Sequence, residues 1–284
     1  MGMLDGKVAV ITGSSRGLGL AIARRYASEG ATVVLSARSA GRVEEAVNAL
    51  KAEGLRAGSL AADVGKREQV EALAQYALTT FGRIDIWVNN AGIPGIYGPT
   101  AHIPNSNFES VLNTNILGVH YGSLTALRHF VPQKRGKLIN LLGRGDTGPV
   151  ANQNAYGASK IWVKSYTLAL AKEYKDSGVG VFAFNPGLVD TDLLRQIEAI
   201  EGYEAGLKPL RTVIRLWANP PEVPAEKALW LASSATDGKT GLNVNVLGRA
   251  QAIAGLARDI GRRLRGVPGP DTTLTITTIP SEMP

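Results

Sequence analysis

The chain has 284 residues, of which 44% are hydrophobic and 19% charged, a composition typical of a soluble globular protein with one large core. It contains no cysteine, which excludes disulfides and thiolate metal sites, and its three histidines (His102, His120 and His129) lack ligand spacing, so no metal site is predicted. The net charge of +7 comes from basic residues spread along the chain without a nucleic-acid motif, so no nucleic-acid partner is expected.

The N-terminal residues carry neither a basic leader with an apolar run nor the Ser or Thr of a myristoylation signal. No later apolar run approaches the thickness of a bilayer. We therefore expect a cytoplasmic protein.

Short β-branched runs alternate with longer amphipathic stretches along the whole chain. Runs that are apolar on both faces, as in buried parallel strands, are Val8–Thr12, Thr32–Ser36, Ile84–Val88, Lys137–Leu141 and Val179–Phe184. A last strand is predicted over Leu242–Leu247. Helices are predicted over Leu18–Glu29, 41–53, 66–81, 106–131 and 153–176, with another starting near Glu222. This alternation predicts an α/β fold, a Rossmann-type doubly wound parallel sheet of about seven strands with helices on both faces.

No repeat or low-complexity linker divides the chain, so we expect one domain over residues 1–248 and a C-terminal extension over 249–284. In the extension, apolar residues recur at helical spacing between arginines: Ile253, Leu256, Ala257, Ile260 and Leu264. We expect this helix to pack on its own domain or at a subunit interface, with membrane contact as the alternative. The proline-containing tail after about Gly266 is expected to be poorly ordered.

A glycine-rich segment, Thr12-Gly-Ser-Ser-Arg-Gly-Leu-Gly19, separates the first strand from the first helix. Glycines let the backbone turn sharply and approach a pyrophosphate, and the helix N-terminus offers free N–H groups with a partial positive charge. A dinucleotide is therefore expected to bind at Gly13, Ser15, Arg16, Gly17, Leu18 and Gly19. A tight turn without a ligand is the alternative.

The second predicted strand ends in Ser36-Ala37-Arg38, where an NAD-binding protein would carry an acidic residue for the ribose 2′-hydroxyl. A guanidinium at this place suits a 2′-phosphate, and Arg16 can reach the same group from the glycine turn. We predict NADP(H) as the cofactor, although either arginine could instead be a solvated surface charge.

From about residue 5 to 248 the chain resembles the short-chain dehydrogenase/reductase family. The motifs that carry the resemblance are Thr12-Gly-x-x-x-Gly-x-Gly19, Asp63-Val64, Asn89-Asn90-Ala91-Gly92, Asn115, Tyr156-x-x-x-Lys160 and Pro186-Gly187 followed by Thr191. The resemblance implies that Asp63 and Val64 flank the adenine and that Thr191 contacts the nicotinamide amide. It also implies cofactor contacts at Asn90, Ala91, Gly92, Tyr156, Lys160, Pro186, Gly187 and Val189, and a homotetramer or homodimer built on the helices near 106–131 and 153–176.

Tyr156 and Lys160 lie one turn apart on a predicted helix and share one face. A lysine ammonium beside a phenol favours the phenolate, so we expect the pKa of Tyr156 to fall from about 10 toward neutrality. Tyr156 is then a candidate general acid/base. The resemblance adds that Lys160 holds the nicotinamide ribose and that Asn115, the third member of the catalytic set, anchors a water relay.

Gly143 stands where the family has a serine that polarises the substrate carbonyl. Losing that donor costs on the order of 2.7 to 4 kcal/mol if nothing replaces it. Arg144, Asp146 and Thr147 follow closely and could compensate. The chain also has short similarities to plant-type chlorophyll b reductases, in Ile86-Trp87-Val-Asn89-Asn-Ala-Gly92 and Thr191-Asp192-Leu-Leu194.

We therefore expect an NADP(H)-dependent oxidoreductase that interconverts a carbonyl and an alcohol on a hydrophobic small-molecule substrate. The segment Leu193–Pro224, which is rich in apolar residues, is the expected substrate cover. A protein that binds NADP(H) with little or no turnover is the main alternative, and a related lyase or epimerase using the same tyrosine is another.

Overall fold

The computed structural model describes residues 2–283 and contains a seven-stranded, all-parallel main sheet in the order β3-β2-β1-β4-β5-β6-β8. Its strands are β1 (Val8–Thr12), β2 (Thr32–Ser36), β3 (Ala57–Ser59), β4 (Ile86–Asn89), β5 (Lys137–Leu141), β6 (Gly180–Asn185) and β8 (Asn243–Asn245). The predicted doubly wound sheet is confirmed. The sequence did not indicate β3, because three residues with a central glycine are too short to give a periodic signal.

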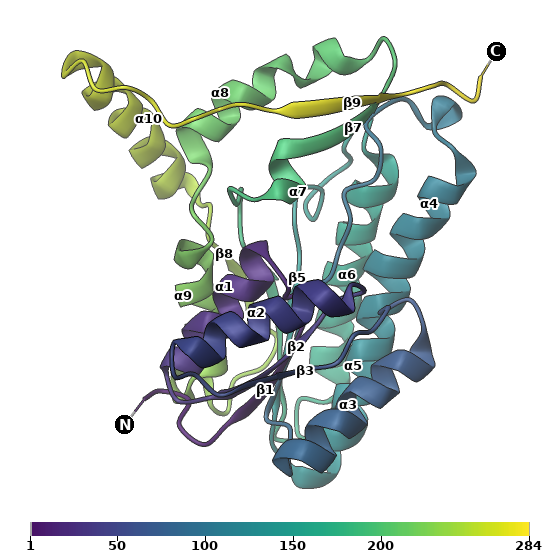
Figure 1. Cartoon of the computed structure of the whole chain (residues 1–284), viewed down its shortest axis with the longest axis vertical. Coiled ribbons are helices and arrows are strands. Elements are labelled where there is room, and N and C mark those ends of the chain that lie inside the picture. The colour runs from purple at the N-terminus through teal and green to yellow at the C-terminus, as the bar shows by residue number, and fades with distance from the viewer. Residues whose placement is uncertain (1, 284) are drawn as a thin grey trace.

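Helices cover both faces of this sheet (Figure 1). One face carries α1 (Gly17–Ser28), α2 (Ala40–Ala52) and α9 (Glu222–Ala232); the other carries α3 (Arg67–Phe81), α5 (Gly118–Gln133) and α6 (Asn154–Glu173). Alternate residues of each strand point into one or the other of two apolar layers, as period-2 side-chain geometry requires.

The helix predicted over 106–131 is divided in the structure. It consists of α4 (Asn105–Leu112), a π-helical turn, η2 (Asn113–Leu117), and then α5. Single π-helical turns inside longer helices occur frequently at functional sites, and this one carries Asn115.

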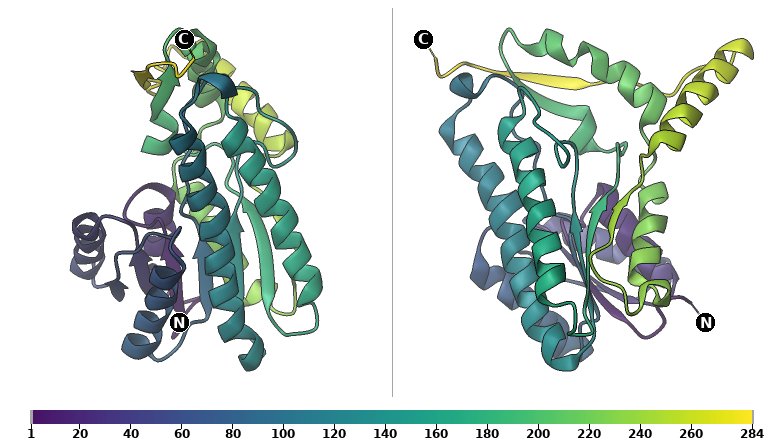
Figure 2. Two further views of the ribbon diagram at one scale, coloured as in Figure 1. Left: turned by 90° about the vertical axis from the view of Figure 1, so that its right-hand side faces the viewer. Right: turned by 180° about the vertical axis from the view of Figure 1, so that it is seen from behind.

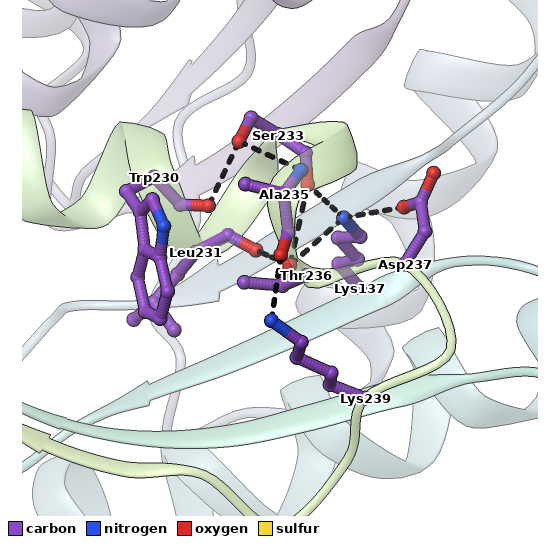
Figure 3. A network of polar contacts seen from close by, with 8 residues as sticks. All are labelled: Lys137, Trp230, Leu231, Ser233, Ala235, Thr236, Asp237 and Lys239. Atoms are coloured by element: carbon purple, nitrogen blue, oxygen red, sulfur yellow. Dashed lines mark hydrogen bonds and ion pairs between the residues drawn. The ribbon is translucent and has the colours of Figure 1, made fainter.

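The N-terminal end of β5 is held by the turn that follows α9 (Figure 3). The Lys137 ammonium donates to the Ser233 carbonyl and the Thr236 hydroxyl and pairs with Asp237 at 2.8 Å. Partial burial lowers the pKa of Lys137, while the neighbouring Asp237 opposes this shift. These contacts fix the strand whose opposite end leads to Gly143.

A second, two-stranded parallel sheet lies apart from the main sheet and joins distant parts of the chain (Figure 1). Strand β7 (Gln196–Ile200) follows the short helix α7 (Asp192–Arg195) and pairs with β9 (Thr275–Ile279). The expectation of a poorly ordered tail is therefore wrong for 275–279. The alternation of Thr and Ile supports a strand there, and β7 supplies the hydrogen-bonding partner that the sequence alone does not reveal.

The C-terminal extension also contains the predicted helix, α10 (Arg249–Leu264), which packs beside α8 (Lys208–Trp217) and projects from the body of the molecule (Figure 2). Its contact with α8 uses Gly255, Arg258 and Asp259 rather than its apolar stripe. The apolar side chains Ile253, Leu256, Ile260 and Leu264 are exposed. The helix thus contacts its own domain through its arginine side, whose guanidinium groups donate to the last carbonyls of α8, and contact of the apolar stripe with a partner subunit or a membrane stays a prediction.

Among residues 2–283, no helix combines the length and the apolar character that crossing a bilayer requires.

Candidate active site

A cavity of about 870 Å³ lies at the carboxyl edge of the main sheet, where the chain leaves β1, β2, β4, β5 and β6. In doubly wound sheets this edge is the usual place for a ligand. All the residues predicted to bind a cofactor line it: Gly13, Ser15, Arg16, Gly17, Leu18, Gly19, Arg38, Asp63, Val64, Asn90, Ala91, Gly92, Tyr156, Lys160, Pro186, Gly187, Val189 and Thr191. Asn115 does not line it.

The glycine turn before α1 leaves room that a side chain would fill. Gly13 has a φ of 64°, and a Cβ there would lie 2.7 Å from the Ala91 Cα. A Cβ at Gly19 would overlap the Gly13 carbonyl oxygen. The Asn90 side chain donates to the Thr12 and Gly13 carbonyls at 2.9 Å each and so fixes the turn against β4. This cradle at a helix N-terminus fits a dinucleotide pyrophosphate.

Three arginines line the end of the cavity beyond β2. Arg16 pairs with Asp192 of α7 at 2.6 Å, an exposed contact between the glycine turn and the opposite wall. Arg38 and Arg42 are exposed and form no ion pair within residues 2–283. Sequence reasoning missed Arg42 because it lies in the first turn of α2 rather than at the strand end.

Tyr156 and Lys160 lie on α6 at the cavity wall, as predicted, with the Lys160 Nζ 5.4 Å from the centre of the Tyr156 ring. The Lys160 ammonium donates to the Leu141 carbonyl at 3.3 Å. Burial raises the pKa of Tyr156 to about 12, with a further rise from Asp146 and an opposing effect from Arg144. Burial also lowers the pKa of Lys160 to about 8. The expected lowering of the phenol pKa by Lys160 is therefore wrong for this structure, because removal from water is the largest influence on the Tyr156 pKa.

Gly143 lies against the hydroxyl group of Tyr156. A Cβ at this position would overlap the Tyr156 hydroxyl oxygen and would lie 3.5 Å from the Lys160 Cε. The phenol thus occupies the space into which a side chain at 143 would project.

The neighbours that could replace the missing donor differ in their placement. Arg144 is exposed and lines the cavity, whereas Thr147 is exposed and does not line it. Asp146 is buried, lies 3.8 Å from the Lys164 ammonium, and has an Oδ2 without a hydrogen-bond partner among the described residues. Gln153, which sequence reasoning missed, also lines the cavity, one helical turn before Tyr156.

Asn115 is fully buried behind the cavity wall. Its side-chain amide accepts from the Ile93 N–H at 2.9 Å and donates to the Ile93 carbonyl and the Ser159 hydroxyl at 3.0 and 3.1 Å. These bonds join the segment after β4, which lines the cavity, to α6, which carries Tyr156. In this structure Asn115 positions its neighbours.

The remaining wall is apolar and comes from the predicted substrate segment. Its cavity-lining side chains are Leu193, Leu194, Ile197, Leu207, Leu210 and Val213. Tyr97, missed in the sequence, lines the facing side. Tyr203 instead contacts His102, and Ile214 and Leu216 are buried outside the cavity.

The family model for short chain dehydrogenases matches residues 7–202. The chain belongs to the short-chain dehydrogenase/reductase family. It is 38% identical to 3beta-hydroxysteroid dehydrogenase 1 of Eggerthella lenta, over 86% of this chain and 94% of that protein. It is 32% identical to glucose 1-dehydrogenase 2 of Bacillus subtilis, over 86% and 95% of the two chains.

Solved structures of the short-chain dehydrogenase/reductase family share the fold. A 3-ketoacyl-(acyl-carrier-protein) reductase from Brucella melitensis complexed with NADH matches with a TM-score of 0.77 and 31% identity, over 87% of this chain and 99% of that chain. A gluconate 5-dehydrogenase from Burkholderia cenocepacia in complex with NADP and tartrate matches with a TM-score of 0.75 and 26% identity, over 86% and 94%. As a short-chain dehydrogenase/reductase, this chain is an oxidoreductase of a family that uses nicotinamide cofactors. The narrower similarity to chlorophyll b reductases stays a prediction.

Proposed function

We propose that this short-chain dehydrogenase/reductase is an NADP(H)-dependent enzyme that interconverts a carbonyl and an alcohol on a hydrophobic substrate. The observation that supports this most directly is the shared cavity. It brings the glycine cradle, the Tyr156–Lys160 pair and an apolar wall to one place. When bound, the nicotinamide supplies or accepts the hydride.

In this proposal Tyr156 transfers the proton at the substrate oxygen, donating it during reduction and accepting it during oxidation. Lys160, held by the Leu141 carbonyl, would orient the ribose and favour the phenolate when it forms. The glycine turn would hold the pyrophosphate through backbone N–H groups, and Thr191 and its neighbours after β6, which line the cavity, would contact the nicotinamide. Asn115 keeps α6 and the segment after β4 in register.

A binding protein with little turnover is the alternative, favoured by two observations. Position 143 offers no side-chain donor, and burial holds the pKa of Tyr156 near 12, far above neutrality. An NADPH-oxidation screen over steroid ketones, quinones, aldehydes and short hydroxyketones decides between the two functions. Turnover of a hydrophobic carbonyl supports the enzyme, whereas tight NADPH binding without any turnover supports the binding protein.

The preference for NADPH over NADH is expected to depend on Arg38. Arg38 and Arg42 have no competing carboxylate among the described residues, whereas Arg16 is paired with Asp192. A hydrogen bond to a charged group contributes roughly 1.5 to 3 kcal/mol, so Arg38→Asp should weaken NADPH binding by about tenfold or more and leave NADH binding nearly unchanged. Fluorescence titration with both cofactors measures this.

Arg135→Asp is the matched control. Arg135 is an exposed arginine just before the N-terminal end of β5, whereas the cavity lies at the carboxyl ends of the strands, and this substitution changes the net charge by the same amount. Equal affinity of the wild-type protein for NADPH and NADH would contradict the proposed cofactor.

A further inference from the structure

Arg195, the last residue of α7, joins two segments that lie far apart in the sequence. Its Nε and Nη2 donate to the two carboxylate oxygens of Asp190 at 2.5 and 2.8 Å. Its Nη2 and Nη1 also donate to the backbone carbonyls of Asp271 and Thr273 at 2.9 and 3.0 Å. One guanidinium thus holds together the loop after β6 and the segment that leads into the C-terminal strand.

That strand, β9, supports the apolar wall of the cavity from outside. It pairs with β7 from Gln196↔Thr275 to Ile200↔Ile279, and Ile197 of β7 lines the cavity. On its other side β7 bonds Tyr97, whose N–H donates to the Glu198 carbonyl at 2.8 Å. Without β9, β7 would be an edge strand held on one side only.

The far end of the C-terminal segment is anchored as well. The Ser281 hydroxyl bonds the His102 Nδ1 at 2.9 Å, and the Glu282 N–H donates to the His102 carbonyl at 3.1 Å. The segment therefore runs from its contact with Arg195, alongside β7, to the loop before α4, and the yellow strand β9 shows this path (Figure 1).

The N-terminal end of α7 contacts the glycine turn through the ion pair between Arg16 and Asp192. Between these two attachments, Leu193 and Leu194 face the cavity. A helix of one turn with an ionic contact at each end is held by its partners, because so short a helix has little stability of its own.

We propose that Arg195 is a positioning residue for the substrate: it latches β9 to the Asp190 loop and so holds α7 and β7 in place as the substrate wall. The substrate part of this inference rests on the proposed function, since it assumes a hydrophobic carbonyl compound in the cavity. A lysine cannot replace the latch, because the four bonds require the planar fork of donors that only a guanidinium offers.

The test compares Arg195→Gln and Arg195→Lys with the wild-type protein and with Arg24→Gln. Arg24 is a matched control because it binds Glu53 through the same two-bond fork, at 3.1 and 2.9 Å, on α1 away from the cavity. The first measurement is hydrogen exchange by mass spectrometry on the cofactor-free protein. In both Arg195 variants we expect the amides of 193–200 and 273–279 to exchange about tenfold faster, or more, than in the wild-type protein. In Arg24→Gln their exchange should match that of the wild-type protein.

The second measurement is steady-state kinetics with a hydrophobic ketone. KM should rise by about tenfold in the Arg195 variants while kcat changes by less than about threefold, because the wall moves but Tyr156 does not. NADPH affinity should stay within about twofold, since the Asp190 N–H still donates to the Asn219 carbonyl at 2.8 Å and keeps its loop in place.

Unchanged exchange in both Arg195 variants would overturn the latch, and faster exchange with an unchanged KM would overturn its role in positioning substrate. If Arg195→Gln does not fold, Arg195→Lys carries the same test. A wild-type protein that turns over no carbonyl would overturn the proposed function, and the exchange result would still decide the latch.

Discussion

Replacing Tyr156 by Phe should reduce kcat by about 10² to 10⁴-fold, the contribution expected of a positioned proton donor. The change removes only the hydroxyl, and the ring keeps its place in the cavity wall beside Lys160. NADPH affinity should therefore remain within about twofold of wild type, so that kcat and kcat/KM fall together. Single-turnover NADPH oxidation and a fluorescence titration measure the two quantities.

Tyr166→Phe provides a control on the same helix. The Tyr166 hydroxyl bonds the His120 Nδ1 at 2.9 Å, burial raises the pKa of Tyr166 to about 12, and the residue does not line the cavity. It should retain turnover near that of the wild type. Near-normal activity in Tyr156→Phe would show that another group transfers the proton.

Gly143→Ala should also be severely impaired, with a loss of about 10²-fold in kcat. A Cβ at 143 would overlap the Tyr156 hydroxyl, so the phenol must move aside. A displacement of a reacting group by about 1 Å lowers the rate by about 10²-fold. This geometry predicts that restoring the family's serine does not raise turnover. The kcat of Gly143→Ser should fall less than that of Gly143→Ala, because the serine hydroxyl can polarise the substrate carbonyl and so offset part of the loss caused by the displaced phenol.

Gly148→Ala is the matched control in the same loop, because a Cβ there meets nothing within 4 Å. It should leave kcat unchanged. A crystal structure of Gly143→Ala with Tyr156 in its original position, or full activity in that variant, would refute the steric argument.

The main sheet was predictable because its strands are buried on both faces. Val8–Thr12, Thr32–Ser36 and Lys137–Leu141 appear in the structure with the predicted bounds. A continuous apolar run followed by an amphipathic helix has few other interpretations in a soluble chain. The glycine turn and the Tyr156–Lys160 pair were also predictable, because both depend only on residues that are close together in the sequence.

Features that depend on contacts between distant residues were not predictable. The strand Thr275–Ile279 forms because β7 is available, and nothing in its own sequence names that partner. The pKa of Tyr156 also escaped prediction, because spacing reveals the nearby lysine but not the extent of burial. Arg42, Tyr97 and Gln153 reach the cavity from elements whose orientation only the fold determines.

The pairing of Gln196 with Thr275 joins residues that are made far apart in time during synthesis. All the strands of the main sheet precede residue 246, so the cofactor cradle can form while the last part of the chain is still in the ribosome. The substrate wall cannot, because β7 must wait for β9, and closing so long a loop carries an entropic cost that grows with its length. We therefore expect a nascent chain to complete its main sheet before the wall that α7 and β7 form.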